Sequence, residues 1–169
     1  MDSCDTLMDI DTIIDGIIAG LVSTCIMTIY EIPFWRIWGI KGILEWHENQ
    51  ILTSKLLKGI SKTKSYTGTY AGILLLHIIN GTLAGIIFPF IYLIFISFFS
   101  QAFQLSTILG IIFGILLWLL TLLPIHKPIT GLPVWNHPLG KGPAIISFCG
   151  HVLYGFTLGT VTNTLFLHR

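Results

Sequence analysis

The sequence predicts an all-α integral membrane protein, a bundle of four transmembrane helices. Only 10% of the 169 residues are charged and 53% are hydrophobic, with a mean hydropathy of +0.83. A soluble domain carries about 25% charged residues, so this chain cannot cover a water-soluble surface. Its apolar residues also form long blocks, each near the roughly 20 residues that a helix needs to cross the bilayer. Continuous blocks favour helices over a barrel, whose strands alternate.

Four blocks meet the length requirement and form a single membrane domain over residues 1–169. They cover about 13–35, 70–98, 105–123 and 143–167. A long basic loop at 36–69 joins the first block to the second, and a short uncharged link joins the second block to the third. The last connection, at 124–142, holds four prolines. Because proline disrupts helices, we expect an ordered non-helical loop there.

Basic residues predict the orientation of the spans. The connections at 36–69 and 124–142 fall on one side of the membrane and hold eight of the nine Lys and Arg residues. Cytoplasmic loops carry an excess of these residues, so both loops should be cytoplasmic and both termini outside, in the plasma membrane. The first fifteen residues hold five Asp and no Lys or Arg. This composition argues against a signal peptide, which needs a basic start.

Part of the long loop has helical periodicity. Between Ile43 and Ile60, apolar residues alternate with Glu45, Glu48, Lys55 and Lys58. The pattern predicts a helix. It fits an amphipathic helix lying on the cytoplasmic membrane face, and equally a helical cap over the bundle.

Glycines four residues apart occur in every predicted span. Such pairs lie on one helix face and let helices approach closely in lipid. Their presence in all four spans predicts a tightly packed bundle. The pairs are Gly16 and Gly20, Gly81 and Gly85, Gly110 and Gly114, and Gly155 and Gly159.

The glycine pairs also suggest an internal repeat. The Gly-Ile-Ile-x-Gly pattern at 16–20 recurs at 110–114, and the pattern HxxxGxxxG that begins at His77 recurs at His151. The chain is therefore predicted to consist of two helical hairpins of the same orientation, related by an axis along the membrane normal. The alternative is chance similarity between glycine-rich apolar helices.

Ionisable residues inside spans are costly and are functional candidates by default. Glu31, His77 and His151 lie within the predicted spans, and His126 follows the third. Helical spacing places the first three on the small-residue faces of their helices. All four are expected to converge in the cytoplasmic half of the bundle.

This candidate site has two interpretations. Imidazole titrates near neutrality and binds metals and haem, which favours a site for protons, a metal or haem. The structural interpretation is hydrogen bonding between helices. Two histidines and a distant glutamate match no recognised metal spacing, so no metal or cofactor is assigned. No catalytic motif is present, and an enzyme is not expected. The net charge of +1 gives no reason to expect a nucleic-acid partner.

The Gly-Ile-Ile-Ala-Gly run at 16–20 with Glu31, His77 with Gly81, and the His-Val-Leu-Tyr-Gly run at 151–155 resemble the YagU-like small inner-membrane proteins. The resemblance covers all four spans and implies a four-span fold but no activity. In its small size, multiple spans and lack of catalytic motifs, the chain is also similar in kind to accessory subunits of membrane oxidases and monooxygenases, including archaeal ammonia monooxygenase.

These observations lead to the expectation of a non-catalytic multi-pass subunit, packed against other membrane subunits in the bilayer. Two alternatives stay open. One is a small oligomeric transporter or channel that uses the Glu/His site, because transporters combine internal repeats with polar residues inside the membrane. The other is a haem or metal binder that uses His77 and His151.

Overall fold

The structure is a computed structural model that describes residues 10–60, 70–96 and 103–167, all of which are helix, turn or loop. Its long helices are α1 (Ile10–Trp38), α3 (Tyr70–Ile96) and α6 (Gly142–Leu167). A fourth consists of α4 (Phe103–Leu117), the π-helical turn η3 (Trp118–Leu122) and α5 (Leu123–Thr130), and is called the third span here. All four are long and apolar enough to cross a membrane. The prediction of an all-helical chain with four helices of membrane-spanning length and apolarity is confirmed.

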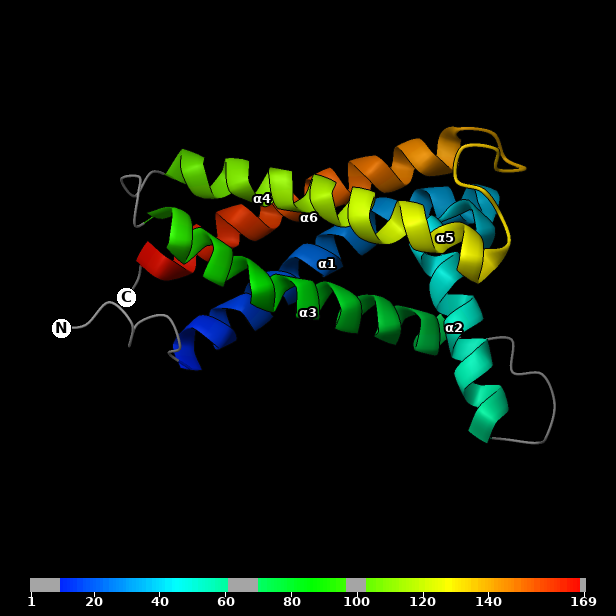
Figure 1. The fold of residues 1–169 in the computed structure, drawn as a ribbon, viewed down its shortest axis with the longest axis horizontal. Coiled ribbons are helices and arrows are strands. Elements are labelled where there is room, and N and C mark those ends of the chain that lie inside the picture. Colours follow the sequence, from blue (N-terminus) through cyan, green and yellow to red (C-terminus); the bar gives the residue numbers. More distant parts are fainter. Residues whose placement is uncertain (1–9, 61–69, 97–102, 168–169) are drawn as a thin grey trace.

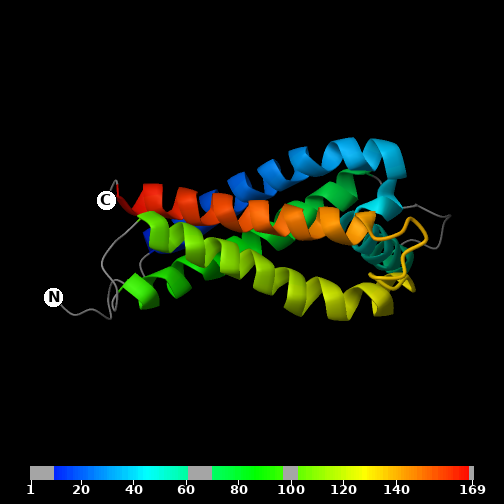
Figure 2. The ribbon, with the colours of Figure 1, turned by 90° about the horizontal axis from the view of Figure 1, so that it is seen from above.

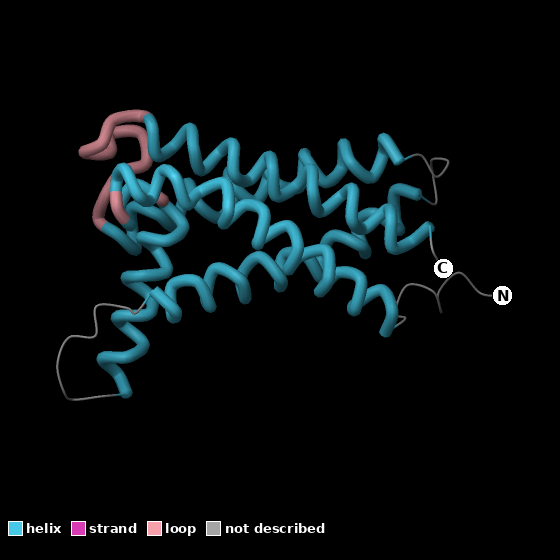
Figure 3. Tube along the Cα trace, turned by 180° about the vertical axis from the view of Figure 1, so that it is seen from behind, coloured by secondary structure: helices cyan, strands magenta, loops and turns pink. Residues whose placement is uncertain are grey.

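The spans pack in a definite order. α1 packs along α3, α4 packs along α6, and α1 and α6 join the two pairs, whereas α3 and α4 barely touch. α3 and the third span diverge toward the end of the bundle where α2 (Leu44–Ile60) lies across it (Figures 1 and 2). The loop at 131–141 lies at this same end (Figure 3). The start of α1 and the end of α6 lie at the opposite end (Figure 1).

Glycines allow the backbones of α1 and α3 to meet. A Cβ atom on Gly16 would lie 2.7 Å from the Cα atom of Ile86. One on Gly20 would lie 3.0 Å from both the carbonyl oxygen of Gly81 and the Cα atom of Gly85. Distances this short leave no room for a side chain, so only glycine permits this approach.

The same contact occurs between α4 and α6. A Cβ atom on Gly110 would lie 2.9 Å from the Cα atom of Gly159, and one on Gly114 would lie 3.2 Å from that of Gly155. Ser106 strengthens the crossing, because its hydroxyl donates a 2.6 Å hydrogen bond to the carbonyl oxygen of Gly159. In both helix pairs, the first glycine of the earlier helix therefore lies against the second glycine of the later helix.

The expectation that 124–142 is entirely non-helical is wrong, because the helix continues to Thr130 before the loop begins. In η3 the N–H of Leu123 bonds to the carbonyl oxygen of Trp118, five residues back. A proline ring clashes with the carbonyl four residues earlier and supplies no N–H. The wider π-helical turn directly before Pro124 is a usual place for a helix to absorb such a disruption. The helix ends at Gly131, whose φ of +77° is costly for other residues.

The predicted loop at 36–69 also contains more helix than its charge suggests. α1 continues to Trp38 and ends at Gly39, whose φ is +67°. The short helix η2 (Ile40–Gly42) then turns the chain into α2. Residues 42–49 are all buried, so the start of α2 is a cap over the bundle. Residues 61–69 lie outside the described part of the chain.

An apolar core fills the middle of the bundle, between α2 and the opposite end. It combines side chains from α1, α3 and α6, and α4 packs against it through Leu109 and Phe113. Two hydroxyls of this core form hydrogen bonds: Tyr154 donates to the carbonyl oxygen of Gly81 at 2.6 Å, and Tyr92 donates to Asn163 Oδ1 at 3.2 Å. The core residues are Ala19, Met27, Phe88, Tyr92, Tyr154 and Leu158.

Candidate functional site

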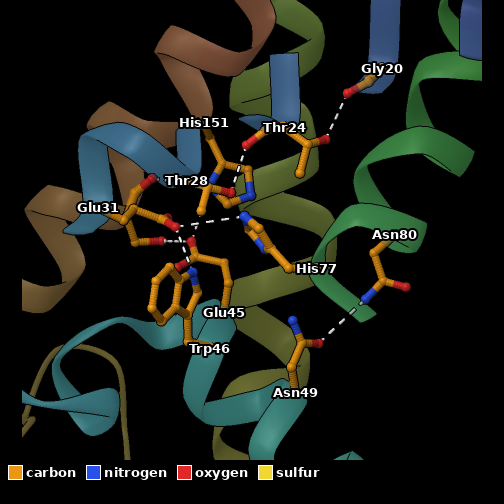
Figure 4. A network of polar contacts seen from close by, with 11 residues as sticks. Gly20, Thr24, Thr28, Glu31, Glu45, Trp46, Asn49, His77, Asn80 and His151 are labelled. Carbon is orange, nitrogen blue, oxygen red and sulfur yellow. Dashed lines mark hydrogen bonds and ion pairs between the residues drawn. The ribbon is translucent and has the colours of Figure 1, made fainter. Parts of the chain in front are cut away.

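The first two turns of α2 are buried although most of their side chains are polar. Glu45, Trp46, Glu48 and Asn49 each contact a different one of the four spans. These contacts join residues between 15 and 106 positions apart in the sequence. Figure 4 shows Glu45, Trp46 and Asn49 approaching from α2 toward side chains of α1, α3 and α6.

Glu45 pairs with His151 of α6, and the Nδ1 atom of His151 lies 3.2 Å from Glu45 Oε1. That Nδ1 is also 3.0 Å from the carbonyl oxygen of Ser147, so it carries a proton, because a carbonyl can only accept. The Ser147 hydroxyl donates to Glu45 Oε1 and accepts a 3.1 Å bond from the indole of Trp118. Burial raises the pKa of Glu45, but hydrogen bonds from His151 and Ser147 and the charge of His151 outweigh it and lower this pKa. Glu45 is therefore ionised at neutral pH.

Glu31 of α1 is completely buried. Its Oε2 atom accepts a 2.7 Å hydrogen bond from the indole Nε1 of Trp46 and lies 3.6 Å from Nε2 of His77, on α3. The rings of Trp46 and His77 are 6.4 Å apart, centre to centre. Among the described residues, Glu31 Oε1 has no hydrogen-bond partner. One buried carboxylate thus joins α1, α2 and α3.

The third pair joins α2 to the third span. Nδ1 of His126 lies 2.9 Å from Glu48 Oε1, and the ring of His47 is 6.0 Å from that of His126. Burial raises the pKa of Glu48, although its hydrogen bond with His126 acts in the opposite direction. Burial and the nearby charge of His126 lower the pKa of His47 to about 4. His47 is therefore neutral at physiological pH.

A cavity of about 370 Å³ lies beside these pairs. Its polar wall is formed by two glutamates, two histidines and two asparagines, with Thr24 and Tyr154. Its apolar wall comes mainly from α3 and the third span. The lining residues are Thr24, Met27, Glu45, Glu48, Asn49, His77, Asn80, Gly81, Leu83, Ala84, Leu117, Leu122, Ile125, His151 and Tyr154.

The four residues selected from the sequence are all buried near α2. His77 and His151 line the same cavity. Glu31 pairs with His77, but His126 and His151 pair with glutamates of α2. The four residues therefore do not contact one another as one cluster. They belong to three Glu–His pairs arranged around one end of the bundle.

Sequence reasoning missed Glu45 and Glu48 as site residues and treated them only as part of a helical pattern. One feature of the sequence could have identified these two glutamates. Three intramembrane or near-membrane histidines needed partners, and Glu31 was the single glutamate inside a span. Glu45 and Glu48 are three residues apart, on one helix face, and could have been considered as the missing partners.

Within 10–60, 70–96 and 103–167, no three or more His, Cys, Asp or Glu side chains are arranged to hold a metal ion. Binding of haem or metal by His77 and His151 stays a prediction. Comparison with protein-family models, curated proteins and solved structures finds no match to the chain. The fold and the site define the class: a four-span helical membrane protein with a Glu/His-lined cavity at one end.

Proposed function

We propose that the protein is a small membrane carrier that exchanges protons for a solute bound in the cavity beside α2. One observation supports this proposal above the others. Glu45 and Glu48 line a cavity inside the bundle, and each is paired with a histidine of a different span. Ionisable groups at such positions are costly and characteristic of proton and solute pathways.

The chemistry of exchange follows from the Glu45–His151 pair. A proton on His151 is stabilised by the carboxylate 3.2 Å away. A positively charged solute group at that carboxylate would repel the imidazolium and favour release of its proton. Protonation of the pair would in turn expel the solute. The two ligands then compete for one buried negative charge, which is the minimum requirement for coupled exchange.

We also propose that the two halves of the bundle are repeated hairpins, α1 with α3 and α4 with α6. The glycine contacts support this, since Gly16 meets Gly85 as Gly110 meets Gly159. His77 and His151 precede the matching glycines by four residues and line the same cavity. Carriers place their sites between such repeats. In this protein α2 breaks the symmetry by supplying the carboxylates.

We propose further that the α2 end faces the cytoplasm, in the plasma membrane. Lys41, Lys55, Lys127 and Lys141 are exposed at this end, which is the asymmetry expected of a cytoplasmic side. The part of α2 beyond Asn49 would lie along the membrane surface, with Lys55 toward the lipid headgroups.

A second candidate is a non-catalytic subunit of a larger membrane complex, such as an oxidase or monooxygenase. It is favoured by the exposed Trp135 and Leu139 on the loop at 131–141, since exposed tryptophans are common anchors of interfaces. Native purification in a mild detergent tests it. Co-purifying subunits lost in Trp135→Ala support it, and a lone chain contradicts it.

The carrier proposal is tested in proteoliposomes that contain a pH-sensitive dye. An inward gradient of methylammonium or potassium should drive proton efflux in the wild type. Glu45→Gln should reduce the protein-dependent flux at least about tenfold, because the competing charge is lost. Asp11→Asn, at the opposite end of α1, is the matched control and should keep wild-type flux. Flux equal to that of empty liposomes with both cations, or unchanged flux in Glu45→Gln, would contradict the proposal.

A further inference from the structure

The cavity reaches the side of the bundle between α3 and the third span. Among its lining residues, Leu83 of α3 is 56% exposed and Ile125 of the third span is 41% exposed. These helices barely touch, and they diverge toward α2 (Figures 1 and 2). Exposed apolar side chains on spanning helices face the bilayer. The cavity is therefore accessible from lipid.

Polarity changes along the cavity. Glu45, Glu48 and Asn49 form its wall at the end of the bundle, whereas Leu83 and Leu117 lie deeper. Leu83 is 13 residues from the start of α3, and Leu117 is 13 residues from the end of the third span. At 1.5 Å per residue both are about 20 Å from the α2 end. That depth is well inside a hydrocarbon core of about 30 Å.

The polar wall of the cavity contains hydrogen-bond acceptors. His77 and His151 already contact Glu31 and Glu45. Among the described residues, the buried Oε2 atom of Glu45 has no hydrogen-bond partner. The residues that line the cavity include two glutamates and no Lys or Arg. A group placed there is stabilised if it donates hydrogen bonds and carries positive charge.

We propose that the cavity binds a single-chain amphiphile with a protonated amine head, which reaches the site from the bilayer between α3 and the third span. The ammonium group lies between Glu45 and Glu48, and the chain lies against Leu83, Leu117 and Ile125. The volume of about 370 Å³ is within the range of roughly 300–1,000 Å³ typical of small-molecule sites. This inference rests on the proposed carrier function and names its solute class.

Other ligand classes fit less well. An anionic head would be repelled by both carboxylates. A small inorganic cation would use the glutamates but leave the apolar wall without a partner. A neutral alcohol would fill the apolar wall and could donate one hydrogen bond to Glu45, but it brings no positive charge to a wall that holds two glutamates. An amine joined to an alkyl chain matches both walls.

The test uses the full chain in phosphatidylcholine nanodiscs with a dodecylamine probe that carries a photoreactive diazirine midway along the chain. After illumination, peptide mass spectrometry locates the labelled residues. We expect labelling within 79–87 and 113–125, prevented by excess dodecylamine but not by dodecanoate or dodecanol. Equal competition by dodecylamine, dodecanoate and dodecanol would overturn the assignment of an amine head group.

Two variants test separately the site of the ammonium group and the route by which the amphiphile enters from the bilayer. Glu45→Gln should reduce labelling at least about fivefold, because it removes the charge that attracts the amine. Leu83→Trp should reduce it similarly by filling the opening, while Leu75→Trp, at a lipid-exposed position on the same helix, should not. Unchanged labelling in Leu83→Trp would overturn the lateral route.

The outcomes also distinguish this inference from the carrier function. Proton flux driven by methylammonium without amine-selective labelling would reject the amphiphile and leave the carrier in place. Amine-selective labelling without proton flux under any gradient would reject the carrier and leave the binding site.

Discussion

The indole Nε1 of Trp46 donates a 2.7 Å hydrogen bond to Oε2 of Glu31. The donor comes from the connecting helix α2, and the acceptor is a completely buried carboxylate on a membrane-spanning helix. His77 approaches the same oxygen from α3 at 3.6 Å (Figure 4). The buried carboxylate and the docking of α2 therefore depend on each other.

Trp46→Phe should loosen α2 and destabilise the bundle. The substitution keeps an aromatic ring but removes the donor to Glu31, and leaving a buried acceptor without its partner costs about 1–3 kcal/mol. Thermal unfolding in detergent measures the loss. Trp135→Phe is the control, because Trp135 is 56% exposed and should change stability little. Adding Glu31→Met to Trp46→Phe should cost less than the sum of the single changes, since each single change removes this same hydrogen bond. Full additivity would show that the contact is not energetically coupled.

Gly114→Leu should separate α4 from α6. The Cβ atom alone would lie 3.2 Å from the Cα atom of Gly155, so a larger side chain must push the helices apart. Overpacking costs about 1–3 kcal/mol, and more where backbone must move. Ile112→Leu, at a position on the same helix that is 47% exposed, should be nearly neutral. Equal denaturant midpoints for the two variants would be incompatible with the close crossing.

Docking of α2 should weaken as the pH falls from about 6.5 to 4. His47 has a pKa near 4 when α2 is docked, against 6.5 when exposed, so the undocked state binds more protons in this range. Stability contributed by neutral His47 is full above pH 6.5 and disappears as the pH falls toward 4. The titratable and charged groups that act on His47 are His126, Lys41 and His137.

Hydrogen exchange of the α2 amides measures this effect, with His47→Gln as the reference. The raised pKa of Glu48 acts in the opposite direction, since its contribution is lost as the pH rises above 4.5. Comparing the wild type with His47→Gln at each pH removes that contribution. The wild type should lose protection in α2 more steeply on acidification. Parallel pH profiles would exclude His47 as the cause.

The orientation can be measured by cysteine labelling in intact cells, starting from a chain without its three native cysteines. An impermeant maleimide should label a cysteine placed at position 3 or 168 from outside. A cysteine at position 60 should react only after permeabilisation, because the basic loops are retained on the cytoplasmic side. The reverse pattern would place the Glu/His cavity at the outer face.

The four spans were predictable because partition into lipid is a local property. Each helix satisfies its own backbone hydrogen bonds, so the apolar composition of about 20 consecutive residues is enough to define a span. The burial of Glu31 and His77 followed from the same reasoning, because a charged group facing lipid is expensive. The sequence placed the end of the third span too early, at about residue 123. The π-helical turn that accommodates Pro124 depends on backbone geometry and has no characteristic amino-acid composition.

The sequence by itself therefore determined a four-span helical membrane protein with buried ionisable groups near one end. Only the tertiary structure decided their partners. Glu45 and His151 are 106 residues apart, and Glu48 and His126 are 78 apart, so no local pattern relates them. Their pairing depends on where Gly39 and η2 direct α2, and on how far α3 and the third span diverge to admit it. Hydropathy is summed along the chain, whereas an ion pair is decided by a few ångströms between helices that packing alone brings together.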